Sequence, residues 1–142
     1  MMKRIRGTAF MAIGLLLLHA SAAPAQAPTM KQLMLDLIHP ASNDILLAVN
    51  RGGPSDDKEW TAVRRSALSL AESGDLLTTR MDSSDWKNAA KLLADAGAEA
   101  YRAAQAKDPK TLAAVTVRLD ASCTTCHKQF RPNVFPREGA SK

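Results

Sequence analysis

The sequence predicts an all-α protein, an antiparallel four-helix bundle. Apolar residues recur at spacings of three and four residues in four separate stretches of the chain, as one face of a helix requires. Short segments rich in turn-forming residues separate these stretches, and neighbouring helices joined by short connections run in opposite directions. No stretch has the apolar and polar alternation of a half-buried strand. The chain of 142 residues is long enough for one domain.

The first predicted helix starts at Thr29. Its apolar face contains Met30, Leu33, Met34, Leu37, Ile38 and Ala41. Pro40 lies within this run and should kink the helix, because proline lacks a backbone N–H and crowds the preceding turn. Asparagine, glycine and proline then predict a loop over residues 50–55.

The second predicted helix begins at Asp56, which with Glu59 resembles a capping box. Its apolar face contains Trp60, Val63, Ala67, Leu70 and Ala71. Gly74 is a natural C-terminal stop, because glycine readily takes the left-handed conformation that ends many helices. Residues 75–82 are therefore expected to form a connection.

The third predicted helix starts near Ser84 and the fourth at Asp108-Pro109, an N-cap followed by a first-turn proline. The apolar face of the third helix contains Trp86, Ala89, Leu93, Gly97, Ala100, Tyr101 and Ala104. The face of the fourth contains Leu112, Val115, Leu119, Cys123, Cys126 and Phe130, and Arg131-Pro132-Asn133 ends it. Many residues of the third helix are alanines, so a neighbour or a cofactor can approach its backbone closely.

Residues 1–25 have the features of a secretory signal peptide: three basic residues, an apolar run over residues 9–18, and then small residues up to Ala25. Ten apolar residues are too few to cross a bilayer core of about 30 Å. We expect cleavage after Ala25, export to the periplasm, and no membrane span in the mature chain, residues 26–142. Removing the three positive charges from the formal +5 of the whole chain leaves +2, which gives nucleic-acid binding little electrostatic support.

Both cysteines of the chain lie in the pentapeptide Cys123-Thr124-Thr125-Cys126-His127. The C-x-x-C-H order is the attachment pattern of a c-type haem. Two thiols three positions apart lie on one side of a helical turn, where they can form thioethers with both vinyl groups of one porphyrin. His127 then offers its imidazole to the iron as an axial ligand. The sequence therefore predicts one covalent haem c.

Three other interpretations of the motif are weaker. A disulfide between residues i and i+3 of a helix has poor geometry. A dithiol redox motif is expected in a thioredoxin-like context of strands and helices, which this sequence lacks. A zinc site needs four ligands, and the remaining histidines are His19, in the predicted signal, and His39. No set of residues typical of hydrolytic or phosphoryl-transfer catalysis is present, so we do not expect an enzyme.

A C-x-x-C-H motif near the C-terminus of an exported all-helical chain resembles the class II cytochromes c, the cytochrome c′ group and its low-spin relatives. The specific match is the segment 121–131, in which an aromatic and a basic residue follow the histidine. The resemblance implies that Cys123 and Cys126 carry the haem and that His127 is the proximal iron ligand. It also implies a periplasmic electron carrier with a redox partner protein, or a binder of small gases. Bundles of this kind often form homodimers.

The sixth position of the iron decides between these two functions. In an up-down-up-down bundle, the end of the fourth helix lies level with the start of the first, which makes Met34 the best-placed distal ligand. At a rise of about 1.5 Å per residue, Met30 lies about 6 Å to one side along the axis and His39 about 7.5 Å to the other. A His/Met iron suits electron transfer, whereas a five-coordinate iron binds NO or CO. Met30, His39 and an open sixth site remain alternatives, and Met34 as plain core packing is another.

Other side chains are candidates for secondary contacts with the haem. The aromatic rings of Trp60, Trp86 and Tyr101 either pack on the porphyrin or belong to the core. Lys128 and Arg131 either offset the haem propionates or interact with the helix dipole at the end of the fourth helix.

Overall fold

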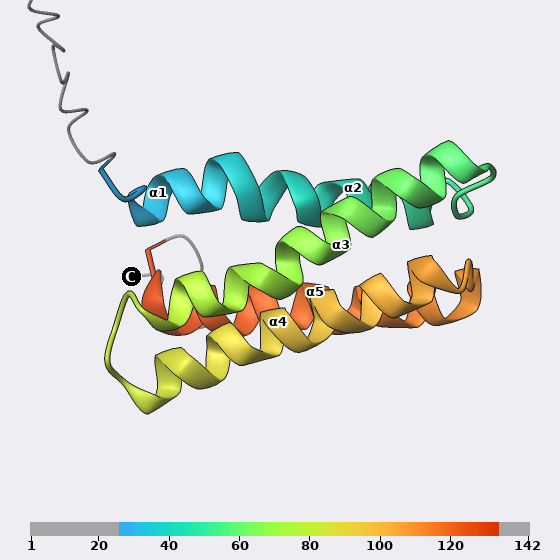
Figure 1. Ribbon diagram of the computed structural model, residues 1–142. Helices are drawn as coiled ribbons and strands as arrows, with labels where there is room; N and C mark the ends of the chain where they lie inside the picture. The colour runs from blue at the N-terminus through green and yellow to red at the C-terminus, as the bar shows by residue number, and fades with distance from the viewer. Residues whose placement is uncertain (1–25, 134–142) are drawn as a thin grey trace, which may run out of the picture.

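A computed structural model describes residues 26–133, and these residues are helical apart from short connections (Figure 1). The elements are α1 (Met30–Gln32), the π-helix η1 (Leu33–Ile38), α2 (His39–Asn50), α3 (Asp57–Thr78), α4 (Ser84–Gln105) and α5 (Pro109–Phe130). Because α1, η1 and α2 follow one another without a break, residues 26–133 contain four helical stretches and no strand. The all-α prediction is confirmed. The predicted signal peptide lies outside the described residues.

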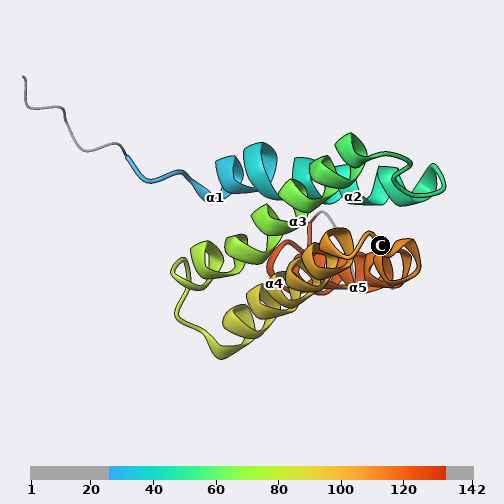
Figure 2. The same cartoon turned by 45° about the vertical axis from the view of Figure 1, so that its right-hand side comes forward.

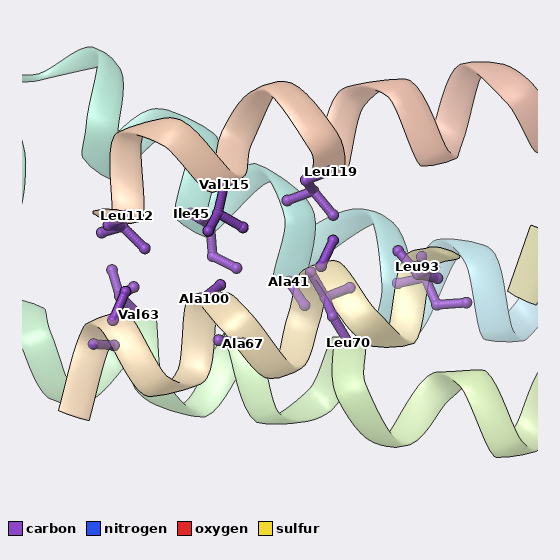
Figure 3. Close-up of a cluster of buried hydrophobic side chains, with 14 of the residues drawn as sticks. Ala41, Ile45, Val63, Ala67, Leu70, Leu93, Ala100, Leu112, Val115 and Leu119 are labelled. Atoms are coloured by element: carbon purple, nitrogen blue, oxygen red, sulfur yellow. The ribbon is translucent and has the colours of Figure 1, made fainter. Parts of the chain in front are cut away.

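The four helical stretches pack side by side (Figures 1 and 2). α4 packs against both α3 and α5, and α2 packs against both α3 and α5. Apolar side chains from all four stretches meet between them (Figure 3). The fully buried large residues of this core are Ile45, Leu70, Leu112, Val115 and Leu119. Each of them lies on a face that the apolar spacing predicts, apart from Ile45, which continues the face of the first helix beyond Ala41.

The first helix changes its hydrogen bonding just before Pro40. The backbone N–H of His39 donates to the carbonyl of Met34, five residues back, instead of four. A proline cannot donate to the ladder and its ring crowds the preceding turn, and a wider π-turn relieves both effects without ending the helix. The disturbance that the sequence predicts at Pro40 is thus accommodated by η1. The start of the helix has a full capping box between Thr29 and Gln32, which was not predicted from the sequence.

Two expectations about α3 need correction. Gly74 does not end the helix, which continues to Thr78, so residues 75–78 are helical and the connection to α4 is only residues 79–83. Gly74 is buried against α4, where an added Cβ would lie 2.5 Å from the Cβ of Ala94. This glycine therefore allows close packing of two helices. At the other end, Asp56 caps the helix as expected.

In the predicted capping box at Asp56, the side chain of Glu59 pairs with Ser55 instead of the backbone N–H of Asp56. The side chain of Asp56 accepts a hydrogen bond from the backbone N–H of Glu59 at 2.8 Å. The carboxylate of Glu59 accepts from the backbone N–H of Ser55 at 2.7 Å and from its hydroxyl at 3.0 Å. These bonds hold the pKa of Glu59 below its usual value. α4 begins at Ser84, as predicted, with Ser83 as its N-cap, and α5 begins after its predicted N-cap, Asp108.

α3 and α4 approach most closely at Gly97. A Cβ at this position would contact the backbone nitrogen of Ala71 and would lie 2.8 Å from the backbone carbonyl carbon of Leu70. Because these contacts are to backbone atoms, they cannot be relieved by a side-chain rotation. The helices can pack at this distance only with glycine at position 97.

We expect Gly97→Ala to lower the free energy of unfolding by about 1–3 kcal/mol, the range for an overpacked core. This loss occurs although alanine favours a helix over glycine by about 1 kcal/mol. Thermal denaturation followed by circular dichroism measures the effect. Gly74→Ala should also destabilise the protein, because its new Cβ would lie 2.5 Å from the Cβ of Ala94, which is fixed to the backbone of α4 and cannot rotate away. A Gly97→Ala variant as stable as the parent would contradict this account of the α3–α4 contact.

No helix within residues 26–133 has both the length and the apolar character that a membrane crossing requires.

Candidate functional site

The motif Cys123–His127 lies on the last two turns of α5, which continues as a helix to Phe130. The side chains of Cys123, Cys126 and His127 are all half-buried, and both cysteines are free thiols. The helical conformation through the motif confirms the local structure that the apolar spacing predicts. It places these three side chains at one end of the helical core.

A cavity of about 670 Å³ lies beside the end of α5. Its volume falls within the range of about 300–1,000 Å³ for sites of small molecules and cofactors. Its lining comes from the first helix, the α3–α4 connection and the ends of α4 and α5: Met30, Lys31, Met34, Leu35, Arg80, Met81, Trp86, Cys126, His127, Phe130 and Arg131. Most of these side chains are apolar, and none is a carboxylate.

The cavity exists because the first helix diverges from α5. α2 packs directly against α5, whereas the backbones of α1 and η1 do not approach α5 anywhere in the described chain. η1 contacts α3 instead. The first helix is thus packed against α5 at one end of the core and separated from it at the end that contains the cysteines and His127.

The structure brings Met34 together with the predicted haem-binding residues. A smaller cavity of about 30 Å³ adjoins the same group of side chains, and Met34, Cys126 and His127 line both cavities. Cys123 lines the smaller one. The two alternative distal residues are placed differently. Met30 lines only the larger cavity. His39 lines neither cavity: its side chain is exposed, and its ring nitrogen Nδ1 lies 3.4 Å from the side-chain amide nitrogen of Asn43.

Trp86 and Phe130 form an apolar wall of the larger cavity. Their rings meet edge to face, with centroids 4.9 Å apart and planes at 83°. Trp86 is buried, and its indole N–H donates a hydrogen bond to the carbonyl of Leu77 at 2.6 Å. Near this wall, the side chain of Gln129 donates to Asp85 at 3.1 Å, which ties the end of α5 to the start of α4. Trp60 and Tyr101, the other aromatic candidates, do not line the cavity.

We expect Trp86→Phe to destabilise the protein by about 0.5–1.5 kcal/mol, because the indole hydrogen bond to Leu77 is lost while the N–H of Arg80 still donates to the same carbonyl. Urea unfolding followed by circular dichroism measures the change. Trp60→Phe is the matched control: Trp60 is also buried, but its indole makes no side-chain hydrogen bond to the described residues. Equal losses of stability in the two variants would show that the bond from Trp86 to Leu77 does not stabilise this wall.

The surroundings of the motif favour the uncharged forms of its three titratable side chains. Burial, together with the positive charge of Arg131, lowers the pKa of His127, which favours the neutral imidazole. Burial also raises the pKa of both Cys123 and Cys126. Neutral imidazole is the form that binds iron. Reactive dithiols have a lowered pKa, so the raised values weigh against the dithiol redox interpretation.

Lys31, Arg80 and Arg131 line the cavity, and only Arg131 was predicted from the sequence. Lys31 follows Met30 on the first helix, and Arg80 lies in the α3–α4 connection. No motif marks Arg80 in the sequence, and only the fold shows that this connection lies beside the end of α5. Lys128, the other basic candidate, is exposed and does not line the cavity.

Comparison of the chain with protein-family models, with curated proteins and with solved structures found no match. Within residues 26–133, no three His, Cys, Asp or Glu side chains are grouped so that they could hold a metal ion.

Proposed function

We propose that the protein is an exported c-type cytochrome with a single haem, which transfers electrons in the periplasm. Cys123 and Cys126 attach the haem, His127 is its proximal iron ligand and Met34 its distal ligand. The proposal rests chiefly on one observation: Met34 from the first helix and Cys126 and His127 from α5 line the same cavity, although they are about ninety residues apart in sequence. It includes an antiparallel order of the four helices, which the packing of α2 against both α3 and α5 supports.

The residues present fit a haem. The cavity is large enough for a cofactor, and its walls are mostly apolar, as a porphyrin ring requires. Arg80 has a buried side-chain nitrogen, Nε, that makes no hydrogen bond within the described chain, so a ligand with acceptor groups would satisfy it. Lys31 and Arg131 add positive charge to the same lining. Together these features suit a flat apolar ligand with acidic groups.

An attached haem supplies exchange of one electron at its iron. The chain's own residues would control this exchange. Burial lowers the pKa of His127 and so favours its neutral imidazole, the form that ligates iron. Met34 offers a thioether to the same cavity, and a His/Met pair raises the reduction potential. Trp86 and Phe130 give one side of the cavity an apolar wall. A redox partner protein would donate or accept the electron.

The alternative proposal is that Met34 only packs in the wall and that the haem binds NO or CO at an open sixth position. One set of optical spectra distinguishes the two functions. The matured protein is recorded in its ferric and ferrous forms, with and without CO. We expect a low-spin spectrum that CO changes little. A high-spin ferrous spectrum that changes promptly with CO would support the gas-binding function instead.

A further inference from the structure

Arg80 has a side-chain hydrogen-bond donor that is unsatisfied in the described chain. Its Nε is buried, and no described residue offers it a hydrogen-bond acceptor. A buried donor without a partner destabilises the fold, and more so when the group is charged. Ser42 Oγ is the other buried side-chain polar atom without a partner in the described chain, and it does not line the cavity near Cys126. Arg80 is therefore the unsatisfied group at the proposed haem site.

The backbone around Arg80 is held in place on the cavity wall. The N–H of Arg80 donates to the carbonyl of Leu77 at 2.9 Å, and the indole of Trp86 donates to the same carbonyl at 2.6 Å. The side chain of Arg80 thus leaves the α3–α4 connection at a point that is fixed against a buried tryptophan. It lines the cavity together with that tryptophan and His127.

The positive charges around the cavity also lack negatively charged partners among the described residues. Lys31, Arg80 and Arg131 line it, no Asp or Glu does, and none of the three forms an ion pair with another residue in the described chain. Three cations around an apolar cavity favour an apolar ligand that carries negative charge. Arginine is suited to such a ligand, because its planar fork of donors can bind a carboxylate through two parallel hydrogen bonds.

We propose that Arg80 binds a haem propionate through its guanidinium group, and that Lys31 and Arg131 supply supporting positive charge. This inference rests on the proposed function, because the propionates belong to the haem that Cys123 and Cys126 would attach. It goes beyond that function in naming a cofactor-binding residue from the α3–α4 connection, which the C-x-x-C-H motif does not indicate. Arg80 thereby orients the porphyrin in its cavity.

The test uses resonance Raman spectra of the haem-loaded full-length protein, in which the bending vibration of the propionates reports their hydrogen bonding. In Arg80→Gln, we expect this band to shift to the position of a solvent-exposed propionate. Arg80→Lys keeps the charge but loses the Nε donor, so its band should shift partway. Arg65→Gln is the matched control, because Arg65 is an exposed arginine on α3 outside the cavity.

The outcomes separate the two proposals. A shift in the Arg80 variants and not in Arg65→Gln supports the propionate contact. An unchanged band in an Arg80 variant that still carries covalent haem overturns the contact and leaves the proposed cytochrome intact. Absence of covalent haem from the parent protein overturns the cytochrome proposal itself. If Arg80→Gln does not load haem, the propionate band of Arg80→Lys decides whether Arg80 contacts the propionate.

Discussion

The double substitution Cys123→Ala and Cys126→Ala is expected to abolish covalent haem attachment while the helical fold remains. A thioether needs the sulfur of each cysteine, so neither attachment point survives. Both side chains are only half-buried and lie beside the cavity, and the fully buried core consists of other residues. Circular dichroism should therefore still show a helical protein. Haem staining of the protein after denaturing electrophoresis measures the attachment, and we expect its complete loss.

The control for this experiment substitutes the two residues between the cysteines. Thr124→Ala with Thr125→Ala changes the same turn of α5 and leaves both sulfurs in place, so covalent haem should persist. Each single cysteine substitution should leave one possible thioether. Covalent haem at the parent level in the double cysteine variant would show that attachment does not occur at this motif.

The substitution Met34→Ala is expected to convert the iron from low spin to high spin. Alanine removes the thioether of Met34, which lines the same two cavities as Cys126 and His127. We expect the reduction potential to fall by more than about 0.1 V, within the span of about 0.8 V that axial ligands set. The ferrous variant should also bind CO promptly, because its sixth position is open. Optical spectra and a redox titration measure these changes.

Met30→Ala provides the matched control for Met34. Met30 is another half-buried methionine of the first helix that lines the larger cavity, but it does not line the smaller one next to Cys123. Its removal should change the size of the cavity and leave the spin state unchanged. If Met34→Ala has the same spectrum as the parent and Met30→Ala is high spin, the distal ligand is Met30.

Most of the fold was predictable, because each helix carries an apolar face at helical spacing and most helices begin with a recognisable cap. The prediction was wrong at Gly74, and the reason is physical. A glycine can end a helix through its left-handed conformation or can lie within a helix where a neighbour leaves no room for a Cβ. Sequence alone does not distinguish these roles. Only the contact with Ala94 of α4 shows that Gly74 has the second role.

The candidate site was predictable where its residues lie close together in the sequence. Cys123, Cys126 and His127 form one motif, and helix geometry places Met34 near them once a bundle is assumed. Arg80 was not predictable, because its relevance depends on the path of the α3–α4 connection past the end of α5. The π-helix was not predictable either. Pro40 indicates a disturbed helix, but tertiary packing decides whether it becomes a kink, a break or a wider turn.

The most direct test of the account is the mass of the mature protein, produced with a working haem-ligation system. We predict a polypeptide that lacks residues 1–25 and carries the mass of one haem that denaturation does not remove. A mature chain with the mass of the polypeptide alone, recovered from cells that attach haem to a known c-type cytochrome, would contradict the account.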